Sequence, residues 1–163
     1  MRTLPAILIG LVGALGAFTS HAAPAHGFEL SSPDIAPGSI IKQAYAFNGF
    51  GCTGQNTSPA ATWRNPPAGT RSFAVMVHDP DAPTGGAGFW HWVVVDIPAT
   101  ATSLSRGVGT PEGRKLPGSA RQIATDFGTP GWGGPCPPVG DKLHRYVFNV
   151  YALKVDRLEL PAN

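Results

Sequence analysis

The chain has 163 residues, with twelve basic and ten acidic side chains and a formal net charge of +2. Only 13% of its residues are charged. Such a chain lacks the basic surface that binds nucleic acids or anionic membranes, so we expect neither as a partner. The length suits a single domain with a substantial core.

Residues 1–23 have the pattern of a secretory signal peptide. Arg2 provides a positive start and is followed by the apolar run AILIGLVGALGAF, which is too short to cross a bilayer comfortably. Small-residue cleavage sites follow, after Ala22 or after Ala25. The alternative is an uncleaved anchor. The pattern predicts a periplasmic or secreted protein whose single domain spans residues 24–163.

The two cysteines, Cys52 and Cys136, are separated by most of the domain. In an oxidising compartment such a pair favours a disulfide bond, although two buried free thiols are the alternative. Closing a loop of about 85 residues would stabilise the fold by about 4.5 kcal/mol in the chain-entropy model.

Three segments have the composition and alternation of β-strands. They are SFAVMVHD at 72–79, FWHWVVVDI at 89–97 and HRYVFNVYAL at 144–153. The 21 glycines and 17 prolines are spread along the chain, and no window of eleven or more residues has an amphipathic helical period. The sequence therefore predicts an all-β domain, built as a sandwich.

Strand alternation places both His91 and His144 at the start of a strand, on a face that continues into apolar side chains. His144 would share its face with Tyr146, Phe148 and Val150, and His91 with Val93 and Val95. A polar group at the end of an apolar face lies at the mouth of the core, where pockets form.

Residues 78–92, HDPDAPTGGAGFWHW, carry most of the candidate chemistry. Asp79 and Asp81 are separated by one proline, and His91 stands between two tryptophans, Trp90 and Trp92. The glycine-rich segment GWGG precedes the second histidine, His144.

Three kinds of site are consistent with these two aspartates and two histidines. A zinc or iron site could use all four, but the spacing of known metal motifs is absent. Paired carboxylates could act in acid–base catalysis, but no nucleophile accompanies them. In an anion site, the imidazoles and the glycine amides of residues 131–134 donate to the ligand, and a carboxylate beside each imidazole raises its pKa. We favour the anion site, with no metal and no cofactor.

Together these segments resemble the phosphatidylethanolamine-binding protein family, in its bacterial Raf-kinase-inhibitor-like branch. The shared motifs are Asp-Pro-Asp-Ala-Pro from Asp79, His-Trp and valines from His91, and Gly-Pro-Cys-Pro-Pro from Gly134, followed by His-Arg-Tyr. The resemblance runs from about Phe28 to the C-terminus. It implies a large central antiparallel sheet packed on a smaller one, few or no helices, and a small pocket that binds anions such as the phosphate of a head group or peptide.

The resemblance also implies the residues of that pocket. They are Asp79, Asp81, Pro83, His91, Gly134 and His144, with Trp90 and Tyr146 nearby. The aspartates would orient the imidazoles, and aromatic side chains would shape a dry hollow around the anion. Pro83 matches a family position that follows a cis peptide bond. The family element N-x-S-P at 56–59 is interpreted as a structural turn, and Trp63 as a core residue.

The implied function is that of a secreted, non-enzymatic binding protein. The alternatives are a secreted kinase- or protease-inhibitor-like protein that acts through its surface and, less favoured, a hydrolase that uses the Asp–His cluster. If imidazolium is the donor, anion binding weakens as the pH rises through the histidine pKa values.

Members of the bacterial branch continue past the position of Asn163 with a helix and a last strand. Without these elements, we expect a wider site or exposed apolar sheet surface, lower stability and a tendency to self-associate.

Overall fold

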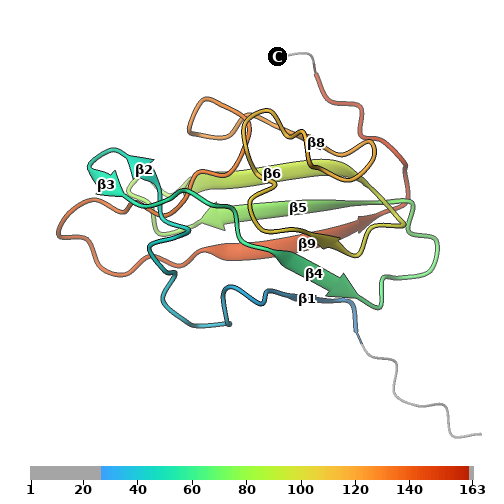
Figure 1. The fold of residues 1–163 in the computed structure, drawn as a ribbon, viewed down its shortest axis with the longest axis horizontal. Coiled ribbons are helices and arrows are strands. Elements are labelled where there is room, and N and C mark those ends of the chain that lie inside the picture. The colour runs from blue at the N-terminus through green and yellow to red at the C-terminus, as the bar shows by residue number, and fades with distance from the viewer. Residues whose placement is uncertain (1–26, 162–163) are drawn as a thin grey trace, which may run out of the picture.

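The computed structural model describes residues 27–161 (Figure 1). The predicted signal peptide lies outside these residues. The described part of the chain contains strands, turns and loops but no helix, and so it offers no helix that could span a membrane. The expected all-β class is confirmed.

The larger of two sheets has four antiparallel strands in the order β8-β6-β5-β9. Their bounds are Arg121–Gln122 for β8, Phe89–Pro98 for β6, Ser72–Asp79 for β5 and Val147–Leu153 for β9. The smaller sheet has the order β1-β4-β7. Its strands are Glu29–Ser31, Ala61–Arg64 and Ser103–Leu104. A separate short hairpin pairs β2 (Asn48–Gly49) with β3 (Cys52–Thr53).

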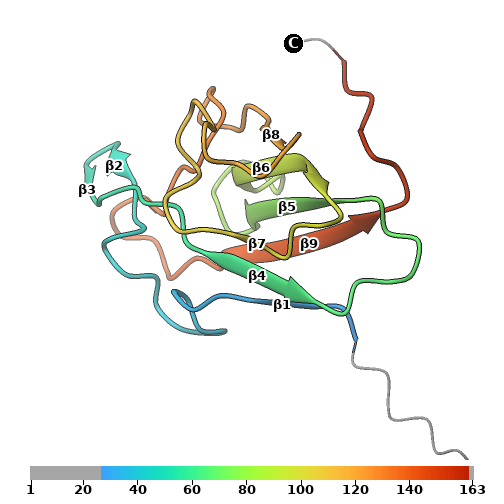
Figure 2. The ribbon, with the colours of Figure 1, turned by 45° about the vertical axis from the view of Figure 1, so that its right-hand side comes forward.

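The core lies between the two sheets. Figures 1 and 2 show β1 and β4 as a layer beside the central sheet. Apolar side chains of both sheets are buried there, among them Trp63 of β4, Phe73 and Val77 of β5, and Trp92 of β6. The rings of Trp63 and Phe73 lie 5.3 Å apart, which confirms Trp63 as a core residue.

β9 begins three residues later than predicted, because the backbone before it is used elsewhere. The amide of Arg145 donates to the carboxylate of Asp81, at 2.9 Å, instead of joining the sheet ladder. Residues 144–146 therefore approach the end of β5 as a loop, and the predicted strand at 144–153 is shortened to Val147–Leu153.

A register shift between β5 and β6 changes the side-chain alternation near His91. Val77 pairs with Trp92 and His78 pairs with Trp90, which leaves His91 as an additional residue on β6. Such an insertion re-aims side chains. The prediction that simple alternation sets His91 on the face of Val93 and Val95 is therefore wrong, and its ring packs instead against Phe89 and Tyr146.

The outer face of β9 carries apolar side chains in solvent. Val147 and Tyr151 are exposed, while Phe148 and Val150, which alternate with them, pack against the core. Self-association through exposed apolar sheet surface stays a prediction.

Cys52 of β3 and Cys136 form a disulfide bond across 84 positions of sequence, as predicted. The bond ties the β2–β3 hairpin to the proline-rich segment at 135–138, two pieces of chain that no sheet joins.

Replacing both cysteines, as in Cys52→Ser/Cys136→Ser, should lower the free energy of unfolding by about 2–5 kcal/mol, because the unfolded chain regains its loop entropy. Urea denaturation of the double variant and the parent measures this difference. In the parent, reduction should raise the intact mass by two hydrogens. An unchanged denaturation midpoint would contradict the stabilising role of the bond.

Candidate functional site

A cavity of about 240 Å³ lies at the end of the central sheet where β5 finishes and β6 begins. Five of the eight predicted ligand residues line it, namely Asp79, Pro83, His91, His144 and Tyr146. Asp81, Trp90 and Gly134 are not among its lining residues. Thr84 and Cys136 also line it, and the rest of the wall is apolar, from Phe50, Ala82, Phe89, Phe127, Pro137 and Pro138.

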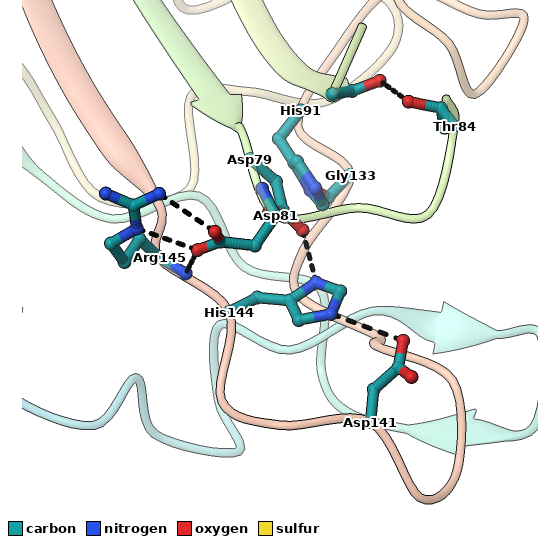
Figure 3. Close-up of polar contacts among 9 residues, drawn as sticks. Asp79, Asp81, Thr84, His91, Gly133, Asp141, His144 and Arg145 are labelled. Atoms are coloured by element: carbon teal, nitrogen blue, oxygen red, sulfur yellow. Dashed lines mark hydrogen bonds and ion pairs between the residues drawn. The ribbon is translucent and has the colours of Figure 1, made fainter. Parts of the chain in front are cut away.

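The polar centre of the cavity is a hydrogen bond between Asp79 and His144 (Figure 3). Nδ1 of His144 donates to Oδ2 of Asp79 at 2.7 Å, and both side chains are almost fully buried. The other oxygen of Asp79 accepts the amide of Asp81 at 2.8 Å. Because both of its oxygens are bonded, Asp79 is held in one position and fixes the orientation of the imidazole.

Asp141 is a member of this cluster that the sequence reasoning missed. Its Oδ2 lies 3.4 Å from Nε2 of His144, and its side chain is partly exposed. The position of Asp141, three residues before His144, was the available signal. His144 thus has a buried carboxylate at one ring nitrogen and a more exposed one near the other.

Asp81 does not serve an imidazole. It accepts the backbone amide of Arg145 at 2.9 Å, and Nε and Nη2 of the same residue at 2.8 Å each (Figure 3). The Arg145 guanidinium and amide hold the pKa of Asp81 well below its usual range. The prediction of one aspartate for each histidine is therefore wrong, because the guanidinium fork satisfies Asp81 outside the cavity.

His91 is oriented by a backbone carbonyl rather than a carboxylate. Its Nδ1 lies 2.6 Å from the oxygen of Gly133, and the residue is buried. Burial lowers the pKa of His91 below 6.5, against smaller raising effects of the Gly133 carbonyl and the charge of Asp79. The expected elevation of this pKa by an adjacent carboxylate is wrong, since desolvation of the imidazolium dominates.

The aromatic neighbours of His91 are not the tryptophans beside it in sequence. Trp90 stacks on His78 with ring centres 4.3 Å apart, and Trp92 is buried in the core. The rings that surround His91 come from other positions of the chain. They are Phe89 and Phe127 at 5.4 Å and Tyr146 at 5.1 Å. Phe127 lies in a glycine-rich loop with no strand pattern, so the sequence carried little sign of it.

Two of the glycine amides expected to bind an anion are already occupied. Gly133 donates to the carbonyl of His91 at 2.9 Å, and Gly134 donates to Oδ1 of Asn56 at 2.8 Å. A Cβ on Gly134 would stand 2.1 Å from the carbonyl oxygen of Tyr45. Glycine is needed at position 134 because its backbone packs closely against the backbone of residues 45–47.

The N-x-S-P element has the structural role expected of it. Asn56 also donates to the carbonyl of Trp132 at 3.0 Å, and Oγ of Ser58 accepts the amide of Gly109 at 2.9 Å. Side chains of this turn therefore satisfy the backbone of two loops.

Pro83 lines the cavity, but the bond before it is trans, since residues 27–161 contain no cis peptide bond. The loop is held by side-chain hydrogen bonds instead. Asp79 accepts the Asp81 amide at 2.8 Å, and Oγ1 of Thr84 donates to the carbonyl of Gly88 at 2.8 Å (Figure 3).

No group of three His, Cys, Asp or Glu side chains suited to a metal ion occurs in the part of the chain described.

Comparison of the sequence with known proteins finds relatives along most of the chain. The YbcL protein of Escherichia coli is 49% identical over 153 residues, which are 94% of this chain and 83% of YbcL. YbhB of the same organism is 44% identical over 81% of this chain and 82% of its own length. LppC of Mycobacterium tuberculosis, named as a candidate lipoprotein, is 35% identical over 88% of this chain and 63% of its own.

The fold is also that of solved structures. The crystal structure of Escherichia coli YbcL, described as a new member of the mammalian PEBP family, superposes with a TM-score of 0.80 at 51% identity and covers 83% of this chain and 82% of that one. A PEBP homolog from Chlamydia trachomatis has a TM-score of 0.65 at 29% identity, with 78% and 76% covered. The family model described as phosphatidylethanolamine-binding protein matches residues 31–163. The chain belongs to the phosphatidylethanolamine-binding protein family.

Proposed function

We propose that this chain is an exported binding protein that holds a small phosphorylated ligand, or a similar oxyanion, in the cavity at the end of β5. The observation that carries the proposal is the buried Asp79–His144 hydrogen bond at the cavity wall. A protonated His144 can donate from Nε2, which lies 3.4 Å from Oδ2 of Asp141, while Nδ1 stays on Asp79. The family description, which names a phosphorylated lipid, agrees with such a ligand.

Tyr146 supplies a second candidate donor. It lines the cavity, and its Oη is buried without a hydrogen-bond partner among the described residues. A buried hydroxyl without a partner is costly, so a ligand oxygen that approached it would be favoured. Burial and the charges of Asp79 and Asp81 raise the pKa of Tyr146 above its ordinary value of 10, so the phenol keeps its proton at neutral pH.

The size and walls of the cavity limit the ligand. Drug-sized ligands occupy pockets of roughly 300–1,000 Å³, and about 240 Å³ suits a head group or a small acid. Phe50, Phe127 and Pro137 at the wall would contact the organic part attached to the anion. The expected ligand is therefore a small organic phosphate with its charged end at His144.

The side chains support binding rather than turnover. Asp79 and His144 have the relation of the orienting carboxylate and the base in hydrolytic triads. The hydroxyl of Thr84, which lines the same cavity, is bonded to a backbone carbonyl, and the phenol of Tyr146 has a raised pKa. Neither hydroxyl is in the activated state that a nucleophile requires.

Isothermal titration of the chain with inorganic phosphate and with phosphoethanolamine tests this function. Binding should weaken by about tenfold or more in His144→Ala and in Tyr146→Phe, because each variant removes a hydrogen bond to a charged ligand. His78→Gln is the matched control, since His78 packs on Trp90 and does not line the cavity. Absence of binding in the parent would refute the proposal, and turnover of a panel of esters and phosphoesters would favour a hydrolase. A target inhibited equally by parent and His144→Ala would favour a surface inhibitor.

Export is a second expectation, supported by the disulfide, which is typical of oxidising compartments, and by the lipoprotein description of a relative. When the full chain is produced in a Gram-negative host, it should be released by osmotic shock with its N-terminus created after Ala22 or Ala25. N-terminal sequencing and intact mass measure this. Recovery of the unprocessed chain with reduced cysteines in the cytoplasm would contradict it.

A further inference from the structure

The two histidines of the cavity differ in the partner that fixes their protons. Nδ1 of His91 lies 2.6 Å from the carbonyl oxygen of Gly133. A carbonyl oxygen can only accept, so Nδ1 of His91 must carry the proton. In a neutral imidazole the other nitrogen, Nε2, then presents a lone pair.

Nε2 of His91 opens onto the cavity. It has no hydrogen-bond partner among residues 27–161. In that range the unpartnered side-chain atoms that are fully buried are Trp63 Nε1, Thr125 Oγ1 and Tyr146 Oη. Nε2 of His91 is not one of them, so it keeps some accessible area. The residue is only 4% exposed, and it lines the cavity. The small accessible area of its unpartnered nitrogen therefore faces the space where a ligand would lie.

The titratable groups around His91 come from two neighbouring segments. Asp79 and His78 lie on β5, and His144 and Tyr146 precede β9. The negative charge of Asp79 favours the imidazolium, but burial outweighs it and lowers the pKa of His91 below 6.5. Above that pKa the ring is neutral, so at neutral pH it offers an acceptor and not a positive charge.

We infer that His91 accepts a hydrogen bond from the bound ligand, and that the cavity therefore selects oxyanions that carry a hydroxyl group over those that carry none. This inference rests on the proposed function and specifies its ligand class. Inorganic phosphate has at least one P–OH at neutral pH, whereas a phosphomonoester has one only as its monoanion, which predominates below its second pKa of about 6. Sulfate and phosphodiesters have none, so the inference narrows the proposed ligand to free phosphate or a free head group rather than the intact diester lipid. The ligand hydroxyl would donate to His91, while its charged oxygens accept from His144.

The physical basis of the selection is lone-pair repulsion in a buried site. An oxyanion without a hydrogen would place an oxygen lone pair against the lone pair of Nε2, with little water to relieve it. Sites built to pair with a ligand hydroxyl reject analogues that lack it more strongly than apolar pockets reject a change in size. Phosphate and sulfate have almost the same shape, so their comparison isolates this single interaction.

The test is titration of the chain with phosphate and with sulfate at pH 7.5 and equal ionic strength. Phosphate should bind at least about tenfold more tightly than sulfate. In His91→Asn, the amide nitrogen can still donate to Gly133 while the acceptor in the cavity is lost, so the preference should fall close to unity. In His91→Gln, an amide oxygen can replace Nε2 as acceptor, so part of the preference should remain. The comparison within the parent needs no variant to fold.

Nitrogen-15 NMR of the phosphate complex provides a second reading at the same pH. His91 should give the shifts of a neutral ring protonated at Nδ1. Equal affinity for the two anions, tighter sulfate binding, or an imidazolium signal from His91 in the complex would overturn this inference and leave the proposed function intact. If neither anion nor phosphoethanolamine binds, the proposed function itself fails.

Discussion

The site depends on the hydrogen bond that joins Asp79 to His144 inside the protein. Burying a carboxylate is strongly unfavourable unless it is paired and fully hydrogen-bonded. Asp79 meets that requirement through His144 and the amide of Asp81. Asp79 ends β5, and His144 precedes β9, which is the strand next to β5 in the sheet. The bond between them therefore closes the apolar core at one end and creates a polar surface there.

Two histidines at one cavity have opposite chemistry because their partners differ. A carboxylate accepts from Nδ1 of His144, whereas at His91 a carbonyl fixes the proton on Nδ1 and burial lowers the pKa of the ring. One wall can thus donate to a ligand while the other accepts from it. The cavity therefore offers a ligand a donor on one side and an acceptor on the other, rather than a net positive charge. This agrees with the carboxylate of Asp79 at its centre.

The sheet and the loops contribute different parts of the cavity. β5 and β6 provide Asp79, Phe89 and His91 at their ends, and loops provide the other wall residues, including His144 and Tyr146. The loops are held by few but strong links: the Cys52–Cys136 bond, the hydrogen bonds of Asn56 to the 132–134 segment, and the close approach that only a glycine at 134 permits. Rigid support of this kind reduces the entropy lost when a ligand binds.

By itself the sequence determined the all-β class, the strands at 72–79 and near 89–97, the disulfide and the family, because each depends on local alternation, cysteine number or adjacent motif residues. It also indicated five residues of the cavity wall. Only the tertiary structure decided the partner of each polar group. Asp81 bonds to Arg145 outside the cavity, and a carbonyl, that of Gly133, accepts from His91 where a carboxylate was expected. Phe127, and not a neighbouring tryptophan, packs against the His91 ring. The physical reason is that a register shift and long-range hydrogen bonds set where side chains point, and neither leaves a periodic trace in the chain.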